Sequence, residues 1–388
     1  MVYLNNAATS YPKPDSVIKA VKNYLDNIPF HSSRAGSEIE KEDIVYTCRQ
    51  KISSLFNIEK PENIIFTSGA TESLNLAIFG LDLKDGHVIT TSIEHNSVLR
   101  PLSSLVKREM IELSIVDCDE NGYVNPESIR NCIKQNTKAI IVNHASNVTG
   151  EVQDIKSISE IAHANECTFV VDASQSAGCI PIDVTSTAID ILAFTGHKSL
   201  YGIQGIGGIY IKSGMKLKPL KVGGTGEKSE SLCQPEEIPM YYEAGTQNLP
   251  GIVSLSSGAD FILKTSLTDI VNKKERILEK AINKILEIPG VILYGRSNAN
   301  NRCPTFSFNI KGIEAQEVGY LLEKSFNIIV RTGLHCAPLI HEIIGSDQIG
   351  LVRVSLSYFT TNEEIDYFIA ALRQICESRD PEAKQKNI

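Results

Sequence analysis

Strand-like and helix-like segments alternate over residues 60–212 of this 388-residue chain, and this pattern constrains the fold more than any other feature. Between the strand-like segments, apolar residues recur with the spacing of one helical face. Apolar strands separated by helices predict a mostly parallel sheet that is covered on both faces, and hence an α/β fold class. The seven segments with the character of buried strands are residues 63–67, 87–91, 111–116, 139–143, 168–172, 190–195 and 206–211.

Two helices are predicted before the first of these strands. Val17, Val21 and Leu25 fall on one helical face, and Val45, Cys48, Ile52 and Leu55 mark a second, longer helix. An apolar face of this kind is typical of a helix that packs on a core.

The pattern changes after residue 250. Residues 306–310 alternate as a strand does, and residues 314–326 have helical spacing. At 388 residues, 42% of them hydrophobic, the chain is long enough for one large and one smaller core. We therefore predict a large domain over residues 15–250 and a smaller α/β domain built from residues 1–14 and 251–388.

Composition excludes several classes of protein. The net charge is −8 and no basic block is present, which argues against nucleic acid and anionic membranes as partners. No apolar segment reaches the roughly 20 residues of a membrane span, and the N-terminus lacks the layout of a signal peptide. The nine cysteines contain no CxxC pair. We expect reduced thiols in a cytoplasmic protein, with neither a disulfide framework nor a metal site.

One lysine and one aspartate suggest a cofactor. Lys198 follows an apolar strand, where partial desolvation lowers the pKa of the amine and makes it a nucleophile toward carbonyls. Asp172 ends a second apolar strand. Because ligands bind at the carboxyl ends of parallel strands, we expect both side chains at one edge of the sheet. A lysine that forms a Schiff base and an aspartate that keeps a pyridinium nitrogen protonated are what pyridoxal 5'-phosphate (PLP) requires.

A phosphate site is predicted where residues 68–72 follow a strand and open a helix. Glycine permits close approach of the backbone, and the free N–H groups of a first helical turn attract a phosphate. The alternative is an ordinary turn with a threonine cap. Thr195 and His197 converge on the same edge of the sheet, which favours the phosphate site.

Three further polar residues lie just after strands. His95 could lie flat on a heterocycle and titrate near neutral pH; the alternative is a histidine in a surface loop. Asn147 and Gln175 could donate hydrogen bonds to a phenolate oxygen; the alternative is that they are solvated or cap a turn.

Cys336 is the one cysteine that we expect to be reactive. It lies in a glycine-containing loop beside Arg331 and His335, both of which could stabilise a thiolate. Arg353 interrupts an otherwise apolar strand and therefore needs an anionic partner. A substrate carboxylate would serve, and a structural ion pair is the alternative.

Taken together, these segments resemble the cysteine desulfurases, a group of NifS-like and selenocysteine-lyase-like enzymes within the class V aminotransferase family of fold-type I PLP enzymes. The resemblance runs nearly end to end and is carried by eight segments in the same order. They are residues 3–9, 68–73, 94–95, 146–150, 171–175, 195–198, 243–248 and 331–337.

The resemblance implies roles for individual residues. Lys198 would form the Schiff base, Asp172 would pair with the pyridine nitrogen and His95 would stack on the ring. Gln175 and Asn147 would lie near the phenolic oxygen. The phosphate would be held by Ala70, Thr71, Thr195 and His197, together with Thr246 from the partner subunit of a homodimer. Arg353 would bind the substrate carboxylate, with Arg331 and Arg34 near the site, and Cys336 would accept sulfur.

The implied reaction converts L-cysteine to L-alanine and leaves a persulfide on Cys336, from which a sulfur-acceptor protein collects the sulfur. The short cysteine loop is similar to that of the SUF and selenocysteine-lyase branch. Selenocysteine cleavage, cysteine β-elimination and transamination are alternative PLP reactions on the same scaffold. A protein of this fold that acts only as a scaffold or sulfur-carrier partner is a further alternative. The chain departs from the family pattern at Asn5, Ser174 and Leu334.

Overall fold

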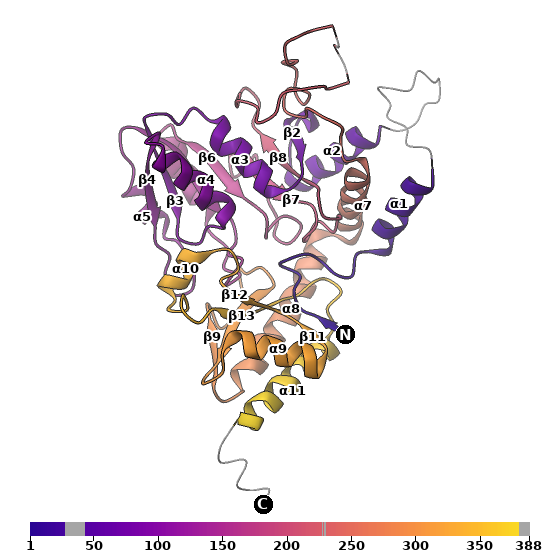
Figure 1. Ribbon diagram of the computed structural model, residues 1–388, viewed down its shortest axis with the longest axis vertical. Coiled ribbons are helices and arrows are strands. Elements are labelled where there is room, and N and C mark those ends of the chain that lie inside the picture. The colour runs from indigo at the N-terminus through magenta and orange to yellow at the C-terminus, as the bar shows by residue number, and fades with distance from the viewer. Residues whose placement is uncertain (28–42, 227, 229, 380–388) are drawn as a thin grey trace, which may run out of the picture.

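The computed structural model describes residues 1–27, 43–226, 228 and 230–379. A large α/β part is built on a seven-stranded sheet, and a smaller part is built on a four-stranded sheet with helices beside it (Figure 1). The N-terminal strand β1 (Val2–Tyr3) lies with the smaller part, where it pairs in parallel with β11 (Ile328–Ile329).

The central sheet confirms the predicted seven strands and their mostly parallel arrangement. Its order is β2-β8-β7-β6-β5-β3-β4, and only β8 runs antiparallel to its neighbours. The strands are β2 (Ile64–Thr67), β3 (Gly86–Thr91), β4 (Ile111–Val116), β5 (Thr137–Asn143), β6 (Thr168–Asp172), β7 (Ile191–Thr195) and β8 (Gly207–Ile211). Strand β8 is reversed because a loop rather than a crossover helix joins it to β7, and directly connected neighbours pair antiparallel.

Two hydrophobic clusters cover the two faces of this sheet. One contains residues of α2 (Ile44–Phe56), α6 (Ile155–Ala164) and α7 (Leu249–Thr265). The other contains residues of α3 (Ala70–Gly80) and α4 (Asn96–Lys107). The short α5 (Pro126–Arg130) and the 3-10 turn η1 (Pro61–Asn63) complete this part. Because side chains on both faces of the sheet are buried, the sequence of each strand is a nearly continuous apolar run.

The prediction that Val17, Val21 and Leu25 form the buried face of the first helix is only partly correct. Helix α1 (Asp15–Asp26) buries Val17, but Leu25 is 66% exposed. The helix lies against α7 near the edge of the molecule, so its far end has no core beneath it (Figure 1).

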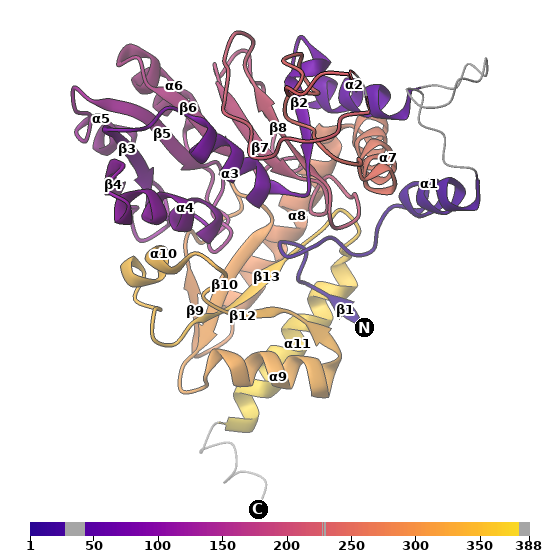
Figure 2. The same cartoon turned by 45° about the horizontal axis from the view of Figure 1, so that its top comes forward.

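The smaller part has a four-stranded antiparallel sheet in the order β12-β13-β10-β9. Helices α8, α9 and α11 supply its core together with the sheet (Figure 2). The elements are α8 (Leu267–Leu286), β9 (Val291–Tyr294), β10 (Thr305–Ile310), α9 (Ala315–Phe326), β12 (Arg331–Gly333), α10 (Pro338–Ile343), β13 (Leu351–Ser355) and α11 (Asn362–Arg379).

Helix α8 takes part in both cores. Ile270, in its first turn, belongs to the cluster of the large part, whereas Ile277 and Leu278 belong to the cluster of the small part. The buried apolar side chains of helix α7 belong to the cluster of the large part. The limits 15–250 and 251–388 remain a prediction, and we propose to move the boundary from residue 250 into α8.

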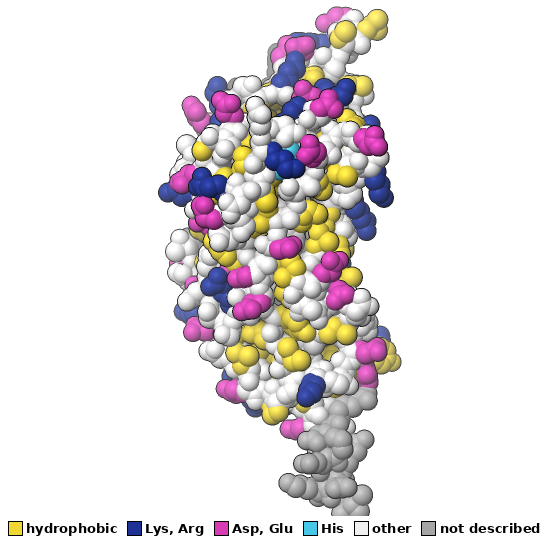
Figure 3. Space-filling model, turned by 90° about the vertical axis from the view of Figure 1, so that its left-hand side faces the viewer, with side chains coloured by type: hydrophobic (Ala, Val, Ile, Leu, Met, Phe, Trp, Pro, Cys, Tyr) yellow, Lys and Arg dark blue, Asp and Glu magenta, His cyan; other side chains and the backbone are white. Residues whose placement is uncertain are grey.

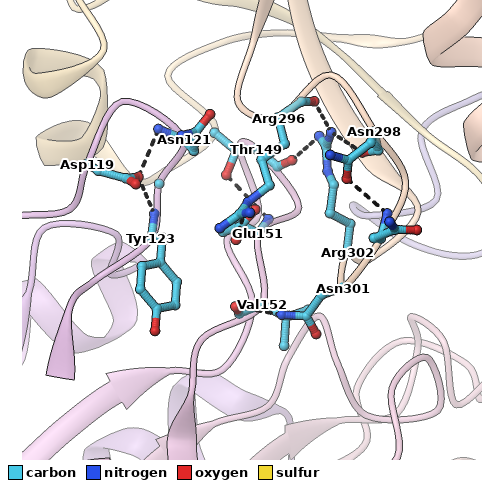
Figure 4. A network of polar contacts seen from close by, with 12 residues as sticks. Asp119, Asn121, Tyr123, Thr149, Glu151, Val152, Arg296, Asn298, Asn301 and Arg302 are labelled. Atoms are coloured by element: carbon cyan, nitrogen blue, oxygen red, sulfur yellow. Dashed lines mark hydrogen bonds and ion pairs between the residues drawn. The ribbon is translucent and has the colours of Figure 1, made fainter.

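A polar network joins the two parts beside the loop after β5 (Figure 4). Arg302, which precedes β10, donates to the carbonyl oxygens of Thr149 and Thr305. Arg296 Nε lies 2.8 Å from Oε1 of Glu151, whose side chain is buried. Charged groups buried in this way fix the contact geometry, because each of them needs its partner in place.

Within the described part of the chain, no helix is both apolar enough and long enough to cross a bilayer. On the face shown in Figure 3, side chains of Lys and Arg are interspersed with those of Asp and Glu. A mixed surface of this kind does not favour polyanion binding.

Candidate active site

A pocket of about 370 Å³ lies where the carboxyl ends of the central strands face the smaller part. This is the position at which α/β sheets bind ligands. Residues from the start of the chain, from the large part and from β12 and β13 all line it. The predicted site residues among them are Ala70, Thr71, His95, Asn147, Asp172, Gln175, Thr195, His197, Lys198, Arg331 and Arg353.

Lys198 and Asp172 reach this pocket from neighbouring strands. Asp172 is the last residue of β6, and Lys198 follows the end of β7, which is parallel to β6. Burial lowers the pKa of Lys198 to about 8, although the charge of Asp172 acts in the opposite direction. Near pH 8, a much larger fraction of this amine is neutral than of the amine of a free lysine. Only the neutral amine can act as a nucleophile.

Ser174 orients the carboxylate of Asp172. Both its backbone N–H, at 2.8 Å, and its hydroxyl donate to Oδ1 of Asp172. Sequence reasoning noted Ser174 only as a departure from the family pattern. The signal that would have found its role is the spacing of two residues from an aspartate, because a side chain at that distance can close an Asx turn.

The start of α3 can hold a phosphate. Its N-cap is Gly69, which has no side chain to cap the helix, so N–H groups of the first turn keep no side-chain acceptor. A Cβ atom on Gly207 would lie 2.6 Å from Gly69 Cα, so glycine at 207 lets the two backbones approach. Nδ1 of His197 is buried without a partner, and burial lowers the pKa of this histidine to about 4. In the tautomer with its proton on Nδ1, the neutral imidazole would donate to an anion at this place.

His95 is held in one tautomer. It is the N-cap of α4, and its Nδ1 accepts hydrogen bonds from the Ser97 N–H at 3.0 Å and from the Ser97 hydroxyl at 2.6 Å. Burial lowers the pKa of His95, which favours the neutral ring. Because Nδ1 accepts from the Ser97 N–H, the proton of the neutral ring lies on Nε2. The capping role had not been predicted, because the helix that follows His95 had not been recognised.

The two predicted amides are already partly engaged. Nδ2 of Asn147 donates to the carbonyl of His335 at 2.6 Å, and Nε2 of Gln175 donates to the carbonyl of Ala7 at 3.2 Å. Each amide nitrogen keeps a second N–H group. Oδ1 of Asn147 is buried without a partner, which marks this side of the pocket as a place for a polar ligand.

Two arginines lie opposite each other on neighbouring strands of the small sheet. Arg331 on β12 pairs in register with Arg353 on β13. Arg353 is 1% exposed; Nη1 donates to the carbonyl of Asn147 at 2.9 Å, and Nε has no partner. Burial lowers the pKa of Arg353 to about 9, and the charge of Arg331 acts in the same direction. A pair of neighbouring cations in a pocket calls for an anion, and a carboxylate matches the guanidinium fork.

Cys336 lies beside this pair but is not part of the pocket lining. Nη2 of Arg331 donates to its sulfur at 3.3 Å, and the Asn96 N–H donates to its carbonyl oxygen at 2.8 Å. His335 and Cys336 both have positive φ values, of 52° and 60°, which non-glycine residues rarely adopt. The loop therefore holds the thiol in a defined place at the rim.

The expected contribution of His335 to a thiolate is wrong. Burial lowers the pKa of His335 well below its ordinary value, and the charge of Arg353 acts in the same direction. A neutral histidine gives no cationic stabilisation. Arg331 is left as the cation next to the sulfur.

Thr246 is exposed and, like Cys336, is not among the residues that line the pocket. The predicted Arg34 lies outside the described residues. Ser97 and Ser174 do line the pocket, although sequence reasoning gave them no role.

Residues 2–368 match the model of the family described as Aminotransferase class-V. The chain belongs to this family. A relative from Methanothermobacter thermautotrophicus, named a probable cysteine desulfurase, is 31% identical over 382 residues, which cover 96% of this chain and 94% of that one. The cysteine desulfurase IscS of Clostridium botulinum is 31% identical, with 97% and 95% covered. Among solved structures, the apo cysteine desulfurase of Thermococcus onnurineus superimposes with a TM-score of 0.88 at 28% identity, with 97% of this chain and 95% of that chain covered.

Proposed function

We propose that this protein is a PLP-dependent cysteine desulfurase, which converts L-cysteine to L-alanine and transfers the sulfur to Cys336 as a persulfide. The observation that carries the proposal is that Lys198, Asp172 and Arg353 line one pocket. The thiol of Cys336 lies beside this pocket and accepts a hydrogen bond from Arg331. The class V relatives named above support it.

The residues present fit PLP. The uncapped start of α3 and the unpartnered Nδ1 of His197 suit the phosphate, with Thr71 and Thr195 beside them. Lys198 would hold the cofactor covalently, and Asp172 would balance the charge of its ring nitrogen. When bound, PLP supplies an electron sink for a carbanion at the substrate Cα.

Substrate binding and proton transfer fall to different side chains of the pocket. Arg353 binds the carboxylate of cysteine and orients the substrate. Lys198, whose pKa burial lowers to about 8, takes the proton from Cα as the neutral amine. His95, neutral and protonated on Nε2, faces the same space from α4.

Sulfur transfer follows at Cys336. Its thiolate attacks the sulfur of the substrate, so an S–S bond forms and the Cβ–S bond breaks. The carbon side takes up a proton and leaves as alanine, and a persulfide remains on Cys336. Arg331 stabilises the negative charge on the attacking sulfur.

The test is alanine formation from L-cysteine by the purified holoenzyme. Cys336→Ala should abolish alanine formation while leaving PLP covalently bound, and Cys233→Ala, a change at an exposed cysteine, should leave the rate unchanged. Unchanged turnover in Cys336→Ala would contradict the persulfide step. Pyruvate as the product would instead indicate β-elimination, and a requirement for a keto acid would indicate transamination. Selenocysteine cleavage that survives Cys336→Ala would indicate a lyase.

The assembly is proposed to be a homodimer in which Thr246 completes the phosphate site of the other subunit. In support, Thr246 is exposed, and the segment before it carries exposed apolar side chains, including Val222 at 72% and Leu232 at 105%. Sedimentation would test the dimer.

We further propose that this is a cytoplasmic protein that passes sulfur to an acceptor protein. The nine unpaired cysteines are consistent with reduced surroundings.

A further inference from the structure

The segment between β1 and α1 links the two parts of the molecule beside the candidate active site. It comprises residues 4–13 and runs from the small part to α1 at the large part (Figure 2). The N–H of Ala7 donates to the hydroxyl of Ser355 on β13 at 2.8 Å, and its carbonyl oxygen accepts from Nε2 of Gln175 at 3.2 Å. Ala7 and Ala8 line the pocket itself. The N-terminal segment therefore belongs to the surroundings of the site.

The carbonyl oxygen of His197 is the point at which this segment meets the loop after β7. It accepts hydrogen bonds from the Ser10 N–H at 3.0 Å and from the Ser10 hydroxyl at 3.2 Å. The hydroxyl of Thr9, at 3.1 Å, and the ammonium group of Lys13, at 2.9 Å, donate to the same oxygen. Within the part of the chain that the structure describes, every donor to this oxygen comes from residues 9–13. A carbonyl oxygen has two lone pairs, so these donors surround it more fully than usual.

The neighbouring carbonyls of this loop are held in a different way. The carbonyl of Gly196 accepts from the Gly202 N–H at 2.8 Å, and that of Lys198 accepts from the Tyr201 N–H at 2.9 Å. Both of these hydrogen bonds lie within the loop itself. The carbonyl of His197 is held only from outside the loop, so its direction depends on the N-terminal segment.

Lys13 is the charged donor of this group. It is half-buried, and its Nζ also lies 2.7 Å from Oγ of Ser10. None of the ion pairs formed within the described ranges includes Lys13. Burial lowers the pKa of Lys13 to about 8, so most of the amine is still protonated at neutral pH. An ammonium group that has lost water needs other acceptors, and hydrogen bonds from an ionised donor are stronger than neutral ones.

The carbonyl that Lys13 holds belongs to the peptide between His197 and Lys198. A peptide group is planar, so fixing its oxygen fixes the plane from which both neighbouring side chains extend. His197 and Lys198 both line the pocket, one at the candidate phosphate site and the other as the candidate nucleophile. Lys13 does not line it. Its influence on these two side chains therefore passes through the backbone.

We propose that Lys13 is a positioning residue of this enzyme, which holds the peptide between His197 and Lys198 so that the amine of Lys198 meets the aldehyde of PLP. The inference rests on the proposed function, because it assumes that PLP is joined to Lys198. The competing role for Lys13 is that of a distant cation for the phosphate, since its charge also acts on the ring of His197.

The test measures how fast PLP becomes joined to Lys198, without any desulfurase turnover. Apoprotein is mixed with PLP, samples are quenched with borohydride at intervals, and the labelled peptide is quantified by mass spectrometry. Lys13→Met should slow labelling of Lys198 about tenfold, because a misplaced amine attacks the aldehyde less often. Lys13→Arg keeps a charged donor and should stay within about threefold of the wild type. Lys19→Met, at an exposed lysine on α1, should label at the wild-type rate.

Pyridoxal, which lacks the phosphate, separates the two roles of Lys13. Positioning predicts that Lys13→Met slows the labelling of Lys198 by pyridoxal and by PLP to a similar degree. Slower labelling by PLP alone would show that Lys13 acts only as a cation for the phosphate, and would overturn the positioning role.

The remaining outcomes are equally decisive. Labelling of Lys13→Met at the wild-type rate would overturn the proposal, and so would Lys13→Arg that is as slow as Lys13→Met. If Lys13→Met does not fold, the neutral variant Lys13→Gln replaces it with the same expectation. Absence of the label from Lys198 in the wild type would instead refute the proposed function, and this inference with it.

Discussion

The guanidinium of Arg331 donates a hydrogen bond through Nη2 to the sulfur of Cys336, with 3.3 Å between the two atoms. The same arginine lies in register with Arg353 on the adjoining strand. One side chain thus connects the rim thiol to the buried cation that we assign to the substrate carboxylate.

Replacing Arg331 by Gln should slow the alkylation of Cys336 by iodoacetamide at neutral pH about tenfold, because a charge-assisted hydrogen bond to the thiolate is worth about 1.5–3 kcal/mol. Alanine formation should fall in parallel. Arg373→Gln, at an exposed arginine on α11, is the control. If Arg331→Gln and the control are alkylated at the same rate, the hydrogen bond does not activate the thiol.

Arg353→Lys should raise KM for L-cysteine about tenfold to a hundredfold with a smaller effect on kcat, because the bidentate grip on the carboxylate is lost while the charge is kept. Steady-state kinetics measure the split. Cysteamine, which has no carboxylate, should bind to the variant and the wild type equally well. A loss confined to kcat would show that Arg353 does not bind the carboxylate.

The loading of apoprotein with PLP should follow the titration of Lys198. The amine attacks the aldehyde only when it is neutral, and burial lowers the pKa of Lys198 to about 8. The loading rate should therefore rise with pH up to about 8 and then level off. Stopped-flow absorbance at a series of pH values gives the profile. A rate that keeps rising toward pH 10 would mean that the lysine titrates as a free side chain.

Gly207→Ala should weaken PLP binding, because the new Cβ would lie 2.6 Å from Gly69 Cα at the start of the phosphate site. Overpacking of this kind costs about 1–3 kcal/mol, so the Kd for PLP should rise about tenfold. Equilibrium titration of the apoprotein measures it. Gly224→Ala, where a Cβ meets nothing within 4 Å, should bind PLP as the wild type does.

The residues predicted best from the sequence are those at strand ends. Asp172, Thr195 and Lys198 follow apolar runs of unambiguous length, and parallel strands bring their carboxyl ends to one edge. Their convergence in the pocket follows from local pattern and sheet geometry alone.

Long-range packing could not be predicted in the same way. Arg331 and Arg353 reach the pocket only because the small sheet docks on the large part, and no local periodicity encodes that docking. The wrong expectation for His335 has the same origin, because the sequence places a histidine beside a cysteine but does not show that the imidazole is buried.

Helix α8 begins in the core of the large part and continues into the core of the small one. Unfolding of either part would remove apolar contacts of α8, and the core of the other part also depends on this helix. The two parts should therefore melt as a single cooperative unit, in spite of their separate sheets, and calorimetry of the apoprotein should record one transition instead of two.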